Sequence, residues 1–203
     1  MFIASLPLYK KLSRQRSINI ARYIAPLLPD SGQALDFGCG NGYTALEVLE
    51  QKQALSIVGV DVVHDQNMNQ NDLNKRFSFI ENKQDALPFA DSTFDASIAA
   101  SAMHHTFSPE FYVDELIRCT KPGSCIILVE EMYLNIPDKI IISAQDWFFN
   151  KMKKGIPVPL HFRSNQHYLQ LFKDKNLEIT FAGSIRPCPP YIHHYVYRLK
   201  VNK

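Results

Sequence analysis

The sequence contains only four cysteines, and none of them stands in a C-x-x-C pair or at a spacing typical of a metal site. No apolar run approaches the roughly 20 residues that cross a bilayer. The apolar start has no charged segment before it and no cleavage site, so it does not resemble a signal peptide. An excess of one charge is also missing, because 22 basic and 20 acidic side chains leave a formal net charge of +2. These absences predict a cytoplasmic protein with buried thiols, no metal, no membrane span and no nucleic-acid partner.

The chain does have the length for one domain with a sizeable core, since 46% of its 203 residues are hydrophobic. Short apolar runs alternate with amphipathic stretches, a pattern typical of a parallel sheet covered by helices. The expected strands are Gln33–Phe37, Ser56–Val60, Phe77–Ile80, Phe94–Ala99 and Ser124–Glu130, followed by an antiparallel pair at Leu177–Gly183 and Tyr191–Val201. The expected helices are Tyr43–Lys52, Asn67–Asn74, Pro109–Thr120 (capped by Ser108) and Asn165–Lys175.

One loop carries most of the functional information: residues 36–42 read Asp-Phe-Gly-Cys-Gly-Asn-Gly, between an expected strand and an expected helix. Alternate glycines let the backbone turn tightly, and a helix N-terminus adds unpaired N–H donors. Such a loop binds either a dinucleotide pyrophosphate or an amino-acid carboxylate. The dinucleotide fingerprint requires glycine or alanine where Tyr43 stands. Asp36 would repel phosphate and suits an ammonium group, so S-adenosylmethionine is favoured over NAD, and a dehydrogenase is disfavoured.

This loop resembles the first motif, E/D-x-G-x-G-x-G, of the class I (Rossmann-like) S-adenosylmethionine-dependent methyltransferases, and further motifs follow in order across residues 33–131. Residues 57–61 resemble the second motif, in which Asp61 would hold both ribose hydroxyls and Val62 would pack on the adenine. Residues 84–89 resemble the third motif, in which Asp85 would accept from the adenine amino group. In the family that acid usually stands further ahead, nearer Lys83 here.

The resemblance is strongest to small-molecule methyltransferases of the ubiquinone/menaquinone-biosynthesis type. It implies an α/β fold with a Rossmann-like seven-stranded, mostly parallel sheet, helices on both faces and the last strand antiparallel. It also implies one methyltransferase domain over 1–203, with a helical cover (1–30), a cofactor-binding core (33–131), an insertion or lid (132–162) and a C-terminal helix and strand pair (163–203). The implied cofactor-binding residues are Asp36, Gly38, Cys39, Gly40, Gly42, Asp61, Val62, Asp85, Ala86, Ala100 and Ser101.

The candidate catalytic residues are His104, His105 and Glu130, all expected at carboxyl ends of strands, where ligands bind in open α/β sheets. A histidine suits the removal of a proton from a methyl acceptor, although local packing is the alternative for either histidine. Glu130, with its neighbour Glu131, could orient the acceptor or act as base. His193 and His194 could reach over the site or lie at the surface, and His161 and His167 beside Arg163 could anchor a substrate.

The two covers are short and apolar, which predicts a small, partly hydrophobic acceptor. The aromatic run 147–149 with Tyr133 could form a lid over it or simply pack on the domain. Two other functions stay open. A protein could bind the cofactor without catalysis, as a sensor or partner subunit. A nucleic-acid methyltransferase is disfavoured, because residues 100–103 lack the Asp/Asn-Pro-Pro-Tyr/Phe-type motif of enzymes that methylate base amino groups. The sequence does not give the acceptor, the atom methylated or the oligomeric state.

Overall fold

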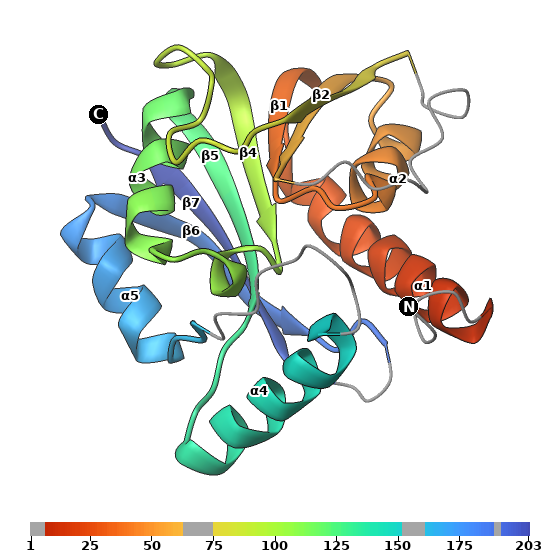
Figure 1. Cartoon of the computed structure of the whole chain (residues 1–203). Helices are drawn as coiled ribbons and strands as arrows, with labels where there is room; N and C mark the ends of the chain where they lie inside the picture. Colours follow the sequence, from red (N-terminus) through yellow and green to blue (C-terminus); the bar gives the residue numbers. More distant parts are fainter. Residues whose placement is uncertain (1–6, 63–74, 152–160, 189–191) are drawn as a thin grey trace.

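A seven-stranded sheet forms the centre of the computed structural model, which describes residues 7–62, 75–151, 161–188 and 192–203 (Figure 1). Its strands are β1 (Ser31–Phe37), β2 (Ala54–Asp61), β3 (Phe77–Glu81), β4 (Phe94–Ala100), β5 (Thr120–Glu131), β6 (Leu177–Ile185) and β7 (His194–Val201). They lie in the order β3-β2-β1-β4-β5-β7-β6. The pairs from β3 to β5 are parallel, whereas β7 runs antiparallel to both β5 and β6. The predicted fold class is therefore confirmed.

Helices α1 (Pro7–Ile24) and α2 (Tyr43–Gln51) cover one face of the sheet, and α3 (Pro109–Cys119) and α5 (Asn165–Asp174) cover the other, whereas α4 (Ile136–Lys151) lies beyond the carboxyl ends of β4 and β5 (Figure 1). Successive residues of a strand point to opposite faces. Leu35 of β1 accordingly packs in the cluster that contains α3 and α5 side chains, while Ala34 packs in the cluster with α1 and α2. Because each face meets helices, the central strands β2, β4 and β5 have continuous buried stretches, as the sequence pattern predicted, whereas the edge strands β3 and β6 are largely exposed.

Local sequence determines where several helices begin. Ser108 is the N-cap of α3, and its Oγ accepts a hydrogen bond from the amide of Phe111 at 3.3 Å, with Pro109 in the first turn, as predicted. Ser164 caps α5 in the same way by accepting from the amide of His167 at 3.1 Å. The helix expected at 67–74 and the loop at 155–159 lie outside the described residues.

The position of β1 explains where a ligand site forms. The chain leaves β1 toward β2 and β3 on one side, while β4 and β5 lie on the other side. In open α/β sheets a crevice opens at such a switch point, outside the carboxyl ends of the strands. A short 3-10 turn, η3 (Met103–His105), follows β4 at this edge. None of the described helices is long and apolar enough to cross a membrane.

Candidate functional site

A cavity of about 440 Å³ lies at the carboxyl ends of β1, β2, β4 and β5. Its volume falls in the range of small-molecule sites. Among the predicted cofactor residues, those that line it are Asp36, Gly38, Cys39, Gly40, Asp61, Val62, Asp85, Ala100 and Ser101. The other two shape neighbouring loops: Gly42 is the N-cap of α2, with its amide bonded to the carbonyl of Cys39 at 2.9 Å, and the Ala86 carbonyl accepts from a side-chain amide.

Asp36 is the buried acid of the glycine loop, with 2% of its surface exposed. Its Oδ2 has no hydrogen-bond partner within the described part of the chain. Burial, aided by the charge of Asp61, raises the pKa of Asp36 to about 7. A buried carboxylate without a partner is costly, so a cationic ligand group beside it would be stabilising. This orphaned oxygen fits a cofactor that carries an ammonium group.

Gly38 allows the backbone to approach the cavity closely. Its φ of +67° lies in the left-handed region, and an added Cβ would collide with the Cβ of Ala102. The Gly38 amide donates to the carbonyl of Val60 at 2.8 Å, which ties the loop to the end of β2. Only glycine tolerates both the left-handed φ and the close approach of Ala102 at this position.

Asp61 stands at the end of β2 with both carboxylate oxygens placed by backbone amides. Oδ2 accepts from Gly40 at 2.8 Å, and Oδ1 accepts from Val62 at 2.7 Å. The first of these bonds joins the first and second motifs across the cavity edge. The carboxylate is thereby oriented before any ligand arrives, as a bidentate acceptor for a diol would require.

Sequence reasoning missed Asn82, which follows β3 and is 8% exposed. Its Nδ2 donates to the carbonyls of Gln84 (3.2 Å) and Ala86 (3.0 Å), and its Oδ1 accepts from the Gln84 amide at 3.1 Å. This side chain therefore folds the loop that presents Asp85 to the cavity. Because the family's acid usually stands nearer Lys83, this position in the sequence could have drawn attention to the neighbouring Asn82.

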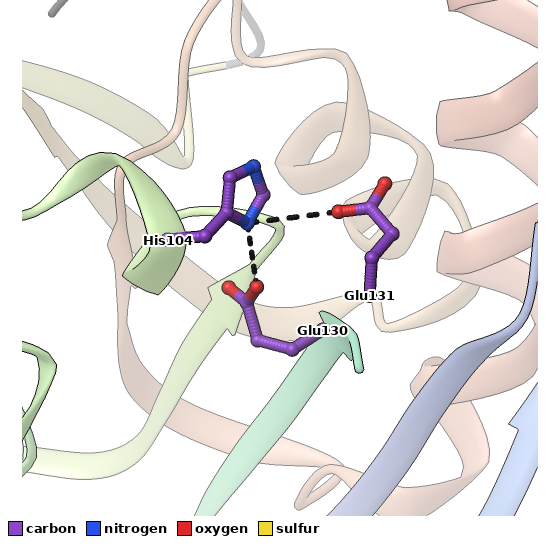
Figure 2. A group of neighbouring side chains, drawn as sticks. All are labelled: His104, Glu130 and Glu131. Atoms are coloured by element: carbon purple, nitrogen blue, oxygen red, sulfur yellow. Dashed lines mark hydrogen bonds and ion pairs between the residues drawn. The ribbon is translucent and has the colours of Figure 1, made fainter. Parts of the chain in front are cut away.

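A buried histidine–glutamate pair follows β4 and β5, and its histidine lines the cavity (Figure 2). Glu130 is 1% exposed, and its Oε2 lies 2.7 Å from Nδ1 of His104. Its Oε1 accepts from the amides of Ala102 (2.8 Å) and Met103 (2.7 Å). Since an ionised carboxylate only accepts, Nδ1 of His104 is the donor, and this tautomer puts the imidazole lone pair on Nε2.

The ring of His104 is also fixed by packing. Phe162 stacks on it with a centroid distance of 4.5 Å and an interplanar angle of 16°, and the ring of His105 lies 4.2 Å away. Both histidines line the cavity. Phe162 was not foreseen, because it comes from the far side of the 132–162 segment.

Glu131 gathers a second group of polar residues from three other elements. Its Oε1 lies 2.8 Å from Arg16 of α1 and 2.8 Å from Nε2 of His194 of β7, and Arg16 also donates to Oγ of Ser101 at 2.6 Å. Burial would raise the pKa of Glu131, but the charges of His194, Arg16 and His104 outweigh it and hold that pKa well below its usual range. Ser101 has a φ of +53°, a strained backbone conformation that clusters at functional sites.

His104, Glu130 and Glu131 could by their ligand types hold a metal ion, because one ligand atom from each lies within 4.8 Å of the others. The distance from Nδ1 of His104 to Oε2 of Glu131 is 3.6 Å (Figure 2). However, Glu130 already accepts three hydrogen bonds and Glu131 already faces the guanidinium of Arg16. Because these carboxylates already accept hydrogen bonds or face a cation, the three side chains are better suited to proton transfer than to binding a metal ion.

His161 adjoins this group, since its amide donates to the carbonyl of His104 at 3.1 Å and its Nδ1 lies 2.8 Å from the carbonyl of Thr106. Other candidates lie apart from it. Arg163 and His167 both bond to Glu110 of α3, at 3.1 and 3.0 Å, and not to the cavity. His193 contacts Arg186 at the surface. Trp147 of α4 is 45% exposed, and the side chains of the two phenylalanines after it lie outside the described residues. None of the described α4 residues lines the cavity.

Comparison with known proteins agrees with this geometry. The methyltransferase domain family matches residues 35–128. The chain is 27% identical over 174 residues to the mitochondrial ubiquinone biosynthesis O-methyltransferase of Dictyostelium discoideum, which covers 77% of this chain and 50% of that protein. It is 29% identical over 110 residues to the demethylmenaquinone methyltransferase of Paenarthrobacter aurescens, covering 52% of this chain and 41% of that one. The chain thus spans about half the length of these curated relatives.

Among solved structures, a Haloferax volcanii protein bound to the Trm112 methyltransferase activator superposes with a TM-score of 0.75 at 18% identity. That match covers 95% of this chain and 93% of the other. It supports the fold alone. Residues 35–128 thus match a methyltransferase domain, which implies S-adenosylmethionine as the cofactor, and the described sheet has the Rossmann-like fold of methyltransferase structures.

Proposed function

We propose that this protein transfers a methyl group from S-adenosylmethionine to a small, partly hydrophobic acceptor by direct displacement. The observation that carries the proposal is His104, which lines the same cavity as the glycine loop at 36–42 and is paired with the buried Glu130 behind it. One cavity would thus combine a cofactor cradle with an oriented base.

The cofactor, when bound, supplies an electrophilic methyl group on a sulfonium centre. Asp36 would bind its ammonium, and the amides of the glycine loop would face its carboxylate. Asp61 would accept from the two ribose hydroxyls and Val62 would contact the adenine. Asp85 and the backbone at Ala86 would lie near the adenine amino group. Ala100 and Ser101, after β4, would line the space beside the methyl group.

His104 would take the proton of the acceptor. Nε2 of His104 would accept the proton of the acceptor's O–H or N–H bond as that bond breaks, and the electron pair would stay on the acceptor atom, ready for the methyl group that the cofactor would supply with loss of its bond to sulfur. The carboxylate of Glu130, held by two amides, stabilises the imidazolium that results. His105 would limit the movement of the ring and border the acceptor, and Glu131 would hold Arg16 and His194 at the same wall.

The cavity combines this polar group with apolar surface. Phe37, Phe107 and Tyr112 contribute aromatic lining. Two of the relatives that the chain resembles are named for ubiquinone biosynthesis and for demethylmenaquinone. These two observations support a small, partly hydrophobic acceptor.

Isothermal titration with S-adenosylmethionine, S-adenosylhomocysteine and NAD tests the cofactor half of the proposal. We expect the first two to bind and NAD not to bind; binding of NAD alone would overturn it. Methyl transfer across a panel of hydrophobic phenols and polar metabolites tests the other half. Turnover of phenols is expected. Turnover of polar metabolites alone would refute the hydrophobic acceptor, and cofactor binding with no turnover at all would favour a sensor or partner subunit.

A further inference from the structure

Phe162 is a buried aromatic residue that packs on the proposed base. It is 3% exposed, and its ring lies 4.5 Å from that of His104 and nearly parallel to it, at 16°. Within the described part of the chain, two apolar clusters join the sheet to its helices, and neither includes Phe162. Phe162 is also not among the residues that line the cavity. Any effect of its ring on the cavity must therefore pass through His104.

Hydrogen bonds of the neighbouring residues hold Phe162 in place. The amide of His161 donates to the carbonyl of His104 at 3.1 Å. Nδ1 of His161 donates to the carbonyl of Thr106 at 2.8 Å, since a carbonyl oxygen only accepts. On the other side of Phe162, Ser164 caps α5. This short segment is thus fixed to η3, the turn that carries His104, and the stacking does not depend on the two rings alone.

Stacking restricts a motion of His104 that its contacts with carboxylates permit. Nδ1 bonds to Oε2 of Glu130 at 2.7 Å, and Oε2 of Glu131 lies 3.6 Å from the same nitrogen. A ring bonded at one nitrogen can still tilt, because the torsion between Cβ and the ring is broad for histidine. A parallel ring packed on its face limits that tilt and so fixes the direction of Nε2. Proton transfer in line with methyl transfer requires such alignment.

The stacked ring also acts on the charge that proton transfer creates. The face of a phenyl ring carries negative electrostatic potential, and a cation over that face is stabilised. The charged or titratable side chains around this imidazole and its two carboxylates come from several described elements: Glu130 and Glu131 (β5), Arg16 (α1), His194 (β7), His105 (η3), Tyr168 (α5) and His161. The aromatic face of Phe162 is an uncharged surface beside them, on which the imidazolium would rest.

We propose that Phe162 is a positioning residue for methyl transfer, because it aligns the imidazole of His104 with the acceptor and stabilises the imidazolium. The proton passes to the lone pair of Nε2, and the acceptor atom keeps the electron pair of the broken bond. The inference rests on the proposed function for the role of His104, whereas the effect of stacking on the imidazole can be measured in the free protein.

Phe162→Leu removes the aromatic face and keeps a buried apolar side chain. For a phenol that the protein methylates, we expect kcat to fall about 3- to 30-fold and KM to stay within about twofold. The acidic limb of the pH profile of kcat should move to lower pH by about half a unit. Phe162→Tyr keeps the face and should restore the wild-type values. If the leucine variant does not fold, Phe162→Met takes its place, since methionine fills irregular gaps.

The matched control is Phe172→Leu, at a fully buried ring of α5 that packs on Tyr168 and Tyr197. It should lower the melting temperature and leave the pH profile of kcat unchanged. An unchanged pH profile in Phe162→Leu would overturn the proposal, whatever its melting temperature. So would a higher KM with unchanged kcat, because Phe162 would then affect acceptor binding and not the base.

NMR of protein with 15N-labelled histidine measures the same effect without acceptor or cofactor. The signals of His104 are identified by their absence from His104→Gln. The pKa of His104 should be about half a unit lower in Phe162→Leu than in the wild type, and an unchanged titration would overturn the proposal. If no phenol is methylated, the proposed function fails, and the NMR titration alone still decides whether Phe162 acts on the imidazole.

Discussion

Two groups of residues around the cavity are built in different ways. The proposed cofactor group consists mostly of backbone and two carboxylates from a single stretch, Asp36 to Val62, whose parts bond to one another. The proposed acceptor group consists of side chains brought together over long distances in sequence, such as Arg16 with Glu131 and with His194. The first group can serve any member of a family, because backbone amides do not depend on side-chain identity. The second group can change with single substitutions, and this is where specificity can arise.

The largest effect expected is on catalysis by the proposed acceptor group. His104→Ala should lower kcat by about 100- to 1000-fold, the usual contribution of a general base. The Kd for S-adenosylmethionine, measured by calorimetry, should stay within about threefold, because His104 is not among the predicted cofactor-binding residues. The control is His193→Ala, at a surface histidine that contacts Arg186. A loss of kcat below about threefold in His104→Ala would remove the base from the mechanism.

The matching test of the proposed cofactor group is Asp61→Ala. Loss of two charge-assisted hydrogen bonds, each worth roughly 1.5–3 kcal/mol, should weaken cofactor binding by about 100-fold or more, while kcat at saturating cofactor changes little. Asp30→Ala removes a carboxylate that is almost fully exposed and pairs only with Lys52, so it controls for the change in net charge. Weakening of less than about tenfold would contradict the ribose role.

A third change separates orientation from mere packing. Glu130→Gln should lower kcat by about 10- to 30-fold and move the acidic limb of the pH–rate profile toward lower pH, because the imidazolium of His104 loses a neighbouring negative charge. A purely structural Glu130 would instead lower the melting temperature and leave the shape of the profile unchanged. The pH profile of kcat, measured beside thermal unfolding, distinguishes the two roles.

The same contrast explains how far the sequence could predict the molecule. The parallel core and the positions of Asp36 and Asp61 follow from local pattern, because strand, loop and helix succeed one another within one motif. The Glu131–His194 contact does not follow from local pattern. It depends on the insertion of β7 between β5 and β6, which places Glu131 and His194 opposite each other in the register of β5 and β7. Arg16 was likewise missed, because a helix pattern shows which residues are apolar but not what a charged side chain reaches.

The smallest expected effect concerns Asp36, whose protonation links the affinity for the cofactor to pH. Its pKa of about 7 in the free protein is raised by burial, and a bound ammonium would lower it. The cofactor therefore binds best above pH 7. Its affinity should fall by at most about tenfold for each pH unit below 7, as the carboxyl becomes protonated and a proton must be released on binding. Calorimetry in buffers of different ionisation enthalpy measures that proton.

The same raised pKa makes the stability of the free protein depend on pH in the opposite direction. Rising pH strengthens cofactor binding but lowers the free energy of unfolding of the free protein. A carboxyl whose folded pKa lies above its unfolded value of 3.8 favours the folded state while protonated and loses that contribution as the pH rises toward 7. Asp36→Asn should thus melt roughly 2–8 °C higher than the wild type at pH 8 while binding cofactor weakly and independently of pH. A variant that lost both stability and affinity would show that Asp36 supports the loop structurally. A gain in stability with a loss of affinity would show that the protein keeps a costly buried charge for its ligand.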